Sequence, residues 1–139
     1  MSVALPDKRI LCVDDEFVMR QALERVLDSY GCKTISTNNG VDAIKIVELM
    51  KPDLIFLDIS MPGMNGHEVV KKLKEMNLND IPIVMLTGDR SNESILKSYG
   101  EGCMYYIIKP FMNEEIKNIV EYLLCDLSEE EKYRLEAKL

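Results

Sequence analysis

Leu54-Ile55-Phe56-Leu57-Asp58 is the stretch that decides the fold. Its first four residues form an uninterrupted apolar run, which is typical of a strand buried on both faces of a parallel sheet. Residues 61–66, just after it, combine glycine, proline and asparagine and therefore predict a loop. The strand thus ends in a carboxylate at the carboxyl edge of the sheet, where α/β folds bind ligands.

Three further apolar runs end in a polar residue in the same way. They cover residues 10–13, 83–86 and 105–108, and they are followed by Asp14 and Asp15, by Thr87, and by Lys109. Because the carboxyl ends of parallel strands share one edge of a sheet, three carboxylates, a hydroxyl and an ammonium group would meet there. This set of groups suits a divalent metal together with a phosphoryl group.

Amphipathic helical patterns separate the apolar runs. We expect strands over residues 9–13, 33–37, 54–58, 81–86 and 104–108, and helices over residues 17–30, 41–50, 67–76, 91–99 and from a cap at Asn113 to about 124. Strands alternating with helices predict right-handed βαβ crossovers. The fold class is therefore α/β, a doubly wound (βα)5 domain over residues 8–125 with a five-stranded parallel sheet and helices on both faces. Residues 126–139 are expected to form a helical tail or linker that opens with a capping box at Ser128.

Composition excludes several classes of protein. A net charge of −7 argues against binding a nucleic acid backbone, which requires clustered lysine and arginine. No apolar run approaches the roughly 18 residues that span a bilayer, and the first residues lack the apolar core of a signal peptide. We therefore expect no membrane association and a cytoplasmic location. The four cysteines contain no Cys-x-x-Cys pair and are expected to be structural rather than zinc ligands.

The three carboxylates of Asp14, Asp15 and Asp58 would repel one another and raise each other's pKa unless a cation were present. Mg²⁺, or Mn²⁺, fits such a set because it takes oxygen ligands and accepts phosphate oxygens. Asp58 is the best candidate nucleophile, and Lys109 can pair with its carboxylate. Taken singly, each residue has a structural interpretation. Asp15, for example, is a candidate N-cap for the helix near Phe17.

These residues resemble the receiver domain of two-component response regulators, which has a flavodoxin-like fold. The match rests on the segments 13–16, 58–66, 86–88 and 106–111, whose order and spacing both fit. The resemblance implies that Asp58 is the phosphoacceptor. It also implies that Asp15, Asp58 and the backbone carbonyl of Ser60 bind Mg²⁺ directly and that Asp14 helps to bind it through water. It further implies that Thr87 and Lys109 hold the phosphoryl oxygens, and that the Lys109-Pro110 peptide bond is cis.

The resemblance also implies a switch and a set of partners. Phosphorylation of Asp58 would draw Thr87 inward and turn Tyr106 into the vacated space, which changes the surface formed by the fourth helix, fifth strand and fifth helix. Ser60 and Asp89 would tune the rate of phosphate loss. The expected partners are a sensor histidine kinase or histidine phosphotransfer protein, and a downstream protein, a phosphorylation-dependent dimer or an output domain. His67, the only histidine, is expected to be solvated or capping.

Other functions fit the sequence less well. A dinucleotide-binding domain would need G-x-G-x-x-G after the first strand, where this chain carries Asp14-Asp15-Glu16. A phosphatase with an aspartyl-phosphate intermediate commonly has a second aspartate where this chain has Ser60, so we expect a phosphoacceptor that slowly dephosphorylates itself and not a turnover enzyme. A phosphorylation-independent, metal-binding interaction module is the remaining alternative. The chain fits either a stand-alone receiver that works through protein–protein contacts or a receiver cut from a larger regulator, and we favour the second. Residues 128–139 fit a linker into a further domain or a small dimerisation helix.

Overall fold

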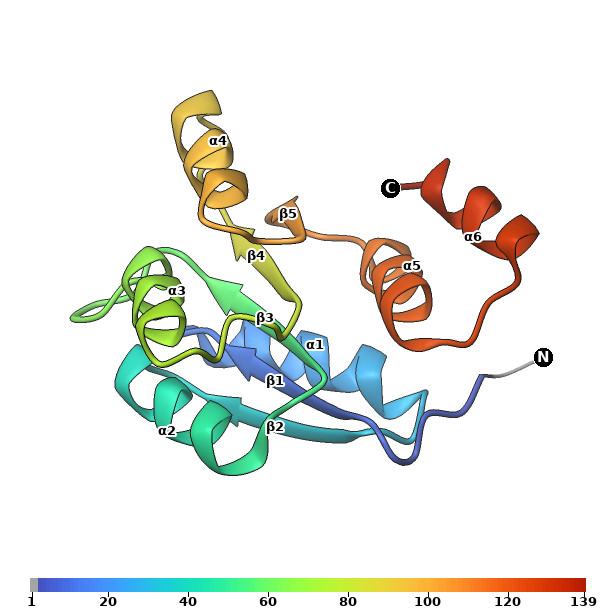
Figure 1. The fold of residues 1–139 in the computed structure, drawn as a ribbon, viewed down its shortest axis with the longest axis horizontal. Coiled ribbons are helices and arrows are strands. Elements are labelled where there is room, and N and C mark those ends of the chain that lie inside the picture. Colours follow the sequence, from blue (N-terminus) through green and yellow to red (C-terminus); the bar gives the residue numbers. More distant parts are fainter. Residues whose placement is uncertain (1–2) are drawn as a thin grey trace.

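The computed structural model describes residues 3–139 and arranges them as one layer of strands between layers of helices (Figure 1). The strands are β1 (Arg9–Val13), β2 (Lys33–Thr37), β3 (Leu54–Asp58), β4 (Ile83–Thr87) and β5 (Tyr105–Ile108). The helices are α1 (Phe17–Asp28), α2 (Gly40–Met50), α3 (Gly66–Glu75), α4 (Asn92–Gly100), α5 (Asn113–Leu124) and α6 (Glu129–Glu136). The predicted α/β fold class is confirmed.

All five strands are parallel and lie in the order β2-β1-β3-β4-β5. Strand β2 lies on one side of β1, whereas β3, β4 and β5 follow in turn on its other side. The direction in which the chain adds strands therefore reverses between β1 and β3. Val13 pairs with Leu57 in this register. The residues that follow the pair, Asp14 and Asp58, therefore lie side by side at the point where this kind of sheet binds ligands.

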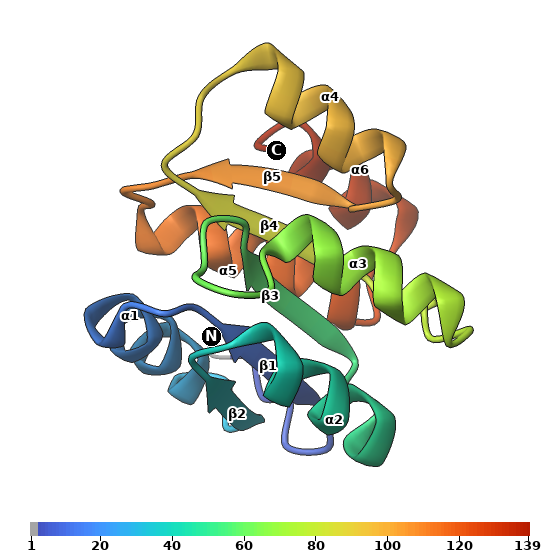
Figure 2. The ribbon, with the colours of Figure 1, turned by 90° about the vertical axis from the view of Figure 1, so that its left-hand side faces the viewer.

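The two faces of the sheet bury separate apolar clusters because successive strand residues point to opposite sides. On one face Ile10, Cys12 and Phe56 pack against α1 and α5. On the other face Leu11 and Ile55 pack against α2 and α3. Figure 2 shows α2 and α3 in front of the sheet and α5 behind it. The continuous apolar strands of the sequence thus become a core on both sides.

Two expected helix ends need correction. α1 ends at Asp28, two residues before the expected Tyr30, and Gly31 then takes a positive φ of 68°. The N-cap of α5 is Met112 and not Asn113, which is the first residue of the helix. Since Asn113 already lies within the helix, it is not the cap; the backbone N–H of Met112 donates a hydrogen bond to the Glu115 side chain at this helix end.

Helix α4 packs against the domain in an unusual way. Its two buried side chains are Ser94 and Ser98, whereas Leu96 and Tyr99 remain 71% and 45% exposed. The hydroxyl of Ser98 is fully buried and has no hydrogen-bond partner among residues 3–139. Since a helix is normally anchored by its apolar side chains, α4 is held less firmly than a helix with an apolar inner face.

The tail forms the predicted helix α6, and the capping box at Ser128 is present. The side chains of Glu130 and Arg134 pair at 2.6 Å, as the spacing predicts. In Figures 1 and 2 this helix folds back from the end of α5 toward the β5 edge of the sheet. Among the described residues, no helix combines the length and the apolar character needed to cross a membrane.

Candidate functional site

Four carboxylates gather at the carboxyl edge of the sheet. Asp14 follows the central strand β1, and Asp58 is the last residue of the neighbouring strand β3. These two side chains are 1% and 3% exposed, while Asp15 and Glu16 are exposed. One oxygen from each of the four side chains lies within 4.8 Å of the others. At such distances unneutralised carboxylates repel strongly, so this edge of the sheet attracts a cation.

Lys109 supplies one positive charge to this cluster from the loop after β5. Its Nζ lies 2.5 Å from Oδ2 of Asp14, 3.5 Å from Glu16 and 3.6 Å from Oδ2 of Asp58. Burial alone would lower the pKa of Lys109, but the hydrogen bond to Asp14 and the nearby negative charges raise it above the usual value. Lys109 is therefore a fixed positive charge, and its direct partner is Asp14.

Asp58 carries the most perturbed carboxyl group of the cluster. Burial and the negative charge of Asp14 raise its pKa from 3.8 to about 7, although Lys109 and the backbone N–H of Ser60 act in the opposite direction. One lysine does not balance the buried charge. A carboxyl with a pKa near neutrality in a recess is a common property of functional sites.

The backbone fixes both buried carboxylates in place. Oδ1 of Asp14 accepts a hydrogen bond of 2.9 Å from the N–H of Glu16, and Oδ1 of Asp58 accepts one of 3.1 Å from the N–H of Ser60. Arg20 on α1 donates to the carbonyl oxygen of Asp14 at 2.7 Å. These bonds limit the rotamers of the carboxylates before any ligand arrives, which is the preorganisation that a binding site needs.

Gly66 brings the start of α3 against the backbone of the site. A Cβ atom at this position would lie 2.6 Å from the carbonyl oxygen of Asp58 and 2.8 Å from Cα of Ile59. Both distances are shorter than real Cβ contacts, so only glycine fits without a shift of the backbone. The N-cap Asn65 and Glu68 complete a capping box that fixes this end of α3.

Thr87 connects the site to the loop between β4 and α4. Its side chain is fully buried, and its Oγ1 accepts a hydrogen bond of 3.3 Å from the N–H of Asp89. Its carbonyl oxygen accepts a bond of 2.8 Å from the N–H of Lys109. The hydroxyl of Tyr106 in turn donates to the carbonyl of Asp89 at 2.6 Å, and its oxygen lies 3.2 Å from the hydroxyl of Ser94, which can donate to it. A continuous set of contacts therefore joins the strand end to α4.

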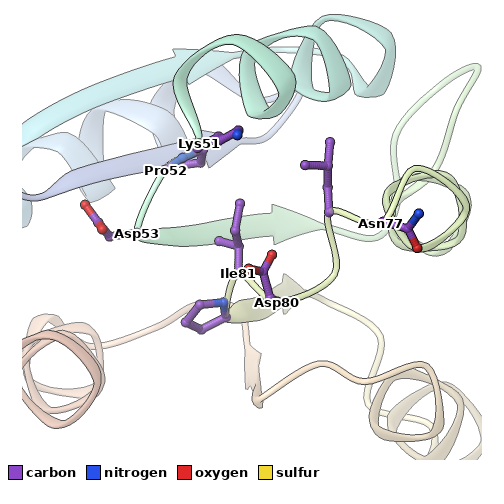
Figure 3. Close-up of a pocket in the computed structure, with 8 residues that line it drawn as sticks. Lys51, Pro52, Asp53, Asn77, Asp80 and Ile81 are labelled. Atoms are coloured by element: carbon purple, nitrogen blue, oxygen red, sulfur yellow. The ribbon is translucent and has the colours of Figure 1, made fainter.

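A recess of about 390 Å³ opens over this edge of the sheet. Its lining includes Glu16, Asp58, Ser60, Asp89 and Lys109. Another cavity, of about 380 Å³, lies at the opposite ends of the strands between Lys51, Asn77 and Ile81 (Figure 3). The second cavity also has two carboxylates in its lining, Asp53 and Asp80, but neither belongs to the cluster of four carboxylates. The cluster borders the first cavity, and we therefore place the candidate site there.

The structure places each candidate residue, and two differences from the expectations stand out. Glu16 joins the cluster, although sequence analysis assigned it no function; its position directly after Asp15 in an acidic run was the available signal. His67 is not solvated, since its Nδ1 lies 2.5 Å from the Glu101 carboxylate and its side chain is 12% exposed. Proximity to the end of α4 cannot be deduced from the local sequence of His67.

Three smaller expectations concern the cap of α1, the Lys109-Pro110 bond and the cysteines. The N-cap of α1 is Glu16 and not Asp15, and it makes no side-chain capping bond. Asp15 thus remains available to the site. The Lys109-Pro110 bond is cis, as the resemblance implies, and all four cysteines are free.

The donor set fits a hard divalent cation. Every group in the cluster offers oxygen, and two of the four carboxylates stay exposed so that water and a ligand can reach them. Mg²⁺ and Mn²⁺ prefer oxygen donors, and Mg²⁺ keeps part of its water shell in such sites. Neither histidine nor cysteine belongs to the cluster, which disfavours zinc.

A parallel sheet of order 2-1-3-4-5 with an acidic recess at its switch point defines a class of phosphate-handling or nucleotide-handling α/β domains. The comparison with protein families narrows this class. The model of the response regulator receiver domain matches residues 10–121. The chain belongs to the response regulator receiver domain family of two-component systems.

Individual relatives agree with this assignment. The chain is 34% identical over 118 residues to sporulation initiation phosphotransferase F of Bacillus subtilis, with 85% of this chain and 94% of that protein covered. It is 31% identical over 135 residues to the two-component response regulator ARR15 of Arabidopsis thaliana, covering 88% and 66% respectively. It spans only 53% of the probable transcriptional regulator ycf29 of Pyropia yezoensis, at 32% identity and with 84% of this chain covered.

Solved structures show the same fold. A two-component response regulator from Clostridium difficile superposes with a TM-score of 0.80 at 30% identity, covering 85% of this chain and 96% of that one. The Vibrio cholerae chemotaxis protein CheY4 superposes with a TM-score of 0.78 at 28% identity, covering 84% and 98%. Both alignments span most of the present chain.

Proposed function

We propose that residues 8–125 form a phosphoacceptor receiver domain in which Asp58 accepts a phosphoryl group in a Mg²⁺-dependent reaction. The observation that carries the proposal is the state of Asp58. Its carboxyl group is buried beside Asp14 and has a pKa of about 7 even though Lys109 is 3.6 Å away. The site therefore has an uncompensated negative charge, which a divalent cation would neutralise.

The chain's own residues have distinct tasks in this reaction. Asp14, Asp15, Asp58 and the backbone carbonyl of Ser60 would hold the metal, which supplies charge neutralisation between a carboxylate and a phosphoryl group. A carboxylate oxygen of Asp58 attacks phosphorus, forms an O–P bond and displaces the donor group. Glu16, at 3.5 Å from the Lys109 ammonium, adds negative charge at the rim of the recess.

Lys109 and Thr87 would stabilise the product. The Lys109 ammonium already lies near both Asp14 and Asp58, so it can pair with a phosphoryl oxygen after a small displacement. The Thr87 hydroxyl lies at the end of the neighbouring strand and can donate to another oxygen once it turns from the Asp89 N–H. Ser60 and Asp89 line the recess and would tune the access of the water that hydrolyses the acyl phosphate.

A switch would connect the phosphoryl group to the surface of α4, β5 and α5. Movement of Thr87 toward the phosphoryl group disturbs its bond to Asp89, whose carbonyl oxygen holds the Tyr106 hydroxyl. Release of that hydroxyl lets the Tyr106 ring turn inward and frees Ser94 on the weakly anchored α4. A local charge event thus biases a two-state surface.

The proposed donors are a sensor histidine kinase or a histidine phosphotransfer protein, because a phosphohistidine supplies a labile phosphoryl group. The phosphoryl group would leave Asp58 by slow self-hydrolysis or by transfer to another protein. The domain would therefore be a phosphoacceptor and not a turnover enzyme. The changed surface would act on a downstream protein, on a second copy of the chain or on an output domain. Residues 126–139 would serve as the tail or linker of the domain.

The decisive test is the intact mass of the protein after incubation with acetyl phosphate and Mg²⁺. We expect one added phosphoryl mass, which disappears with EDTA and in Asp58→Ala. Asp80→Ala, a change of an exposed carboxylate at the opposite end of the strands, is the matched control and should phosphorylate normally. Absence of the adduct in the wild-type protein, together with failure to bind beryllofluoride, would leave the alternative of a phosphorylation-independent metal-binding interaction module.

A further inference from the structure

The tail of the chain lies against the surface that the proposed switch would change. We call the outer side of Tyr99, Tyr105, Tyr106 and Ile119 the α4–β5–α5 face. A cavity of about 140 Å³ is lined by these residues together with Lys138 and Leu139 from the end of the tail. In Figures 1 and 2, α6 turns back along α5 toward this edge of the sheet, so the chain itself occupies part of the face.

One specific hydrogen bond holds the tail in this position, and a ring contact positions its donor. The hydroxyl of Tyr122 on α5 donates a hydrogen bond to the Glu136 carboxylate at the end of α6. The Tyr122 ring also meets the Tyr105 ring edge to face, with centroids 6.4 Å apart and an interplanar angle of 85°. Tyr122 therefore connects β5 and α5 to the tail through both its ring and its hydroxyl.

The tail is bound weakly enough to dissociate from the α4–β5–α5 face. No side chain of α6 is buried, and its first turn carries Glu129, Glu130 and Glu131. An eight-residue helix is not stable in isolation, because helix nucleation is costly and few hydrogen bonds offset it. Its docking thus depends on the contacts around Glu136 and Leu139, and the loss of one of them shifts the equilibrium measurably.

Tyr106 links the tail to the phosphorylation site. Tyr106 is one of the residues that line the cavity beside Lys138 and Leu139, while its hydroxyl contacts the carbonyl of Asp89, two residues after Thr87. If Tyr106 changed position, the wall of this cavity would change and the tail would lose a neighbour. The present position of Tyr106 and the docked position of the tail therefore support each other.

We propose that α6 and residues 137–139 form an intramolecular cover for the α4–β5–α5 face, whose docking opposes the phosphorylated state. This inference rests on the proposed function and adds a regulatory element to it. By thermodynamic reciprocity, a tail that favours the present position of Tyr106 weakens phosphoryl-group binding by the factor by which phosphorylation weakens tail docking. Partners that bind this face, including a second copy of the chain, must first displace the tail.

Hydrogen exchange of residues 129–139 in the full chain tests the inference, with beryllofluoride and Mg²⁺ as the probe of the phosphorylated state. We expect exchange in this segment to be about two- to tenfold faster when beryllofluoride is bound. Tyr122→Phe, which removes only the hydroxyl that holds Glu136, should accelerate exchange by a similar factor without beryllofluoride. The same variant should bind beryllofluoride about two- to tenfold more tightly than the wild type.

Tyr133→Phe is the matched control, because Tyr133 lies on α6 with its side chain 76% exposed. It should leave both the exchange rate and beryllofluoride affinity unchanged. Unchanged exchange of residues 129–139 despite bound beryllofluoride, or unchanged affinity in Tyr122→Phe, would overturn the inference while leaving the proposed function intact. Failure of beryllofluoride to bind, seen separately as a missing fluorine NMR signal, would overturn both.

Discussion

The ammonium nitrogen of Lys109 lies 2.5 Å from Asp14 and 3.6 Å from Asp58, so the lysine is bonded to the neighbour of the proposed phosphoacceptor. This arrangement leaves Asp58 as the less neutralised of the two buried carboxylates. It also keeps Lys109 close enough to meet a phosphoryl group on Asp58. The division of charge between Asp14 and Asp58 underlies the first three predictions.

Replacement of Lys109 by methionine should destabilise the metal-free protein by about 1–3 kcal/mol, because Asp14 loses its buried partner. Mg²⁺ should recover most of that loss, since it neutralises the same carboxylates without competition from an ammonium group. Urea unfolding with EDTA and with Mg²⁺ measures both effects. Lys45→Met, an exposed change on α2, should show neither; equal Mg²⁺ stabilisation of Lys109→Met and the wild type would contradict the prediction.

Replacement of Asp58 by asparagine should stabilise the metal-free protein above neutral pH. The folded-state pKa of Asp58 is about 7 and its ordinary value is 3.8, so the folded protein binds this proton more tightly than the unfolded chain. Its contribution to stability is therefore full below pH 4 and is lost as the pH rises toward 7 and beyond.

We expect Asp58→Asn to exceed the wild type by about 1–3 kcal/mol at pH 8 and to converge with it near pH 4. Urea titrations in EDTA at several pH values provide the measurement. Asp80→Asn, the control, should keep the wild-type pH profile. A constant difference between Asp58→Asn and the wild type at every pH would show that burial of the charge is not the cause.

Mg²⁺ binding should weaken as the pH falls through 7. The metal requires ionised Asp58, so protonation of this carboxyl competes with binding. The apparent dissociation constant should rise by up to about tenfold for each pH unit below 7. Calorimetric titration of Mg²⁺ from pH 5.5 to 8.5 tests this; a constant affinity over that range would assign the pKa shift to another group.

Gly66→Ala should destabilise the protein by about 1–3 kcal/mol, because the added methyl group collides with the backbone of Asp58 and Ile59. The displacement should also reduce the yield of phosphorylated protein, since Asp58 itself has to move. Gly100→Ala is the control, because a Cβ atom at the end of α4 meets no neighbour within 4 Å. Thermal unfolding with equal losses for both variants would argue against the close approach at Gly66.

Ser98→Ala should stabilise the domain by roughly 0.5–1 kcal/mol. Its hydroxyl is buried without a partner among residues 3–139, and alanine has the higher helix propensity. Ser94→Ala is the contrasting change, because it removes a hydrogen-bond partner of the Tyr106 hydroxyl and should not stabilise. Urea unfolding of the two variants distinguishes them, and a loss of stability in Ser98→Ala would indicate a hydrogen bond that the structure does not contain.

Much of the fold follows from patterns within short segments. Each buried strand is an apolar run of four or five residues, and each loop beside the site contains turn-forming residues. Register between parallel strands places the residues after those runs at one edge, which is why Asp14, Asp58, Thr87 and Lys109 could be grouped before the structure was known. Helix ends were less accurate, as at Met112, because capping depends on which side chain reaches the free N–H.

The sequence by itself determined the parallel, doubly wound class of the fold, the carboxyl edge and the residue types that meet there, because local periodicity and the geometry of βαβ units suffice for these features. Only the tertiary structure decided that Lys109 bonds Asp14, that His67 meets Glu101, and that the residues after α6 lie against the α4–β5–α5 face. These relationships join residues 34 or more positions apart, or depend on the path of a polar tail. They arise from packing distances of a few ångströms, which no local pattern of hydrophobicity or turn chemistry encodes.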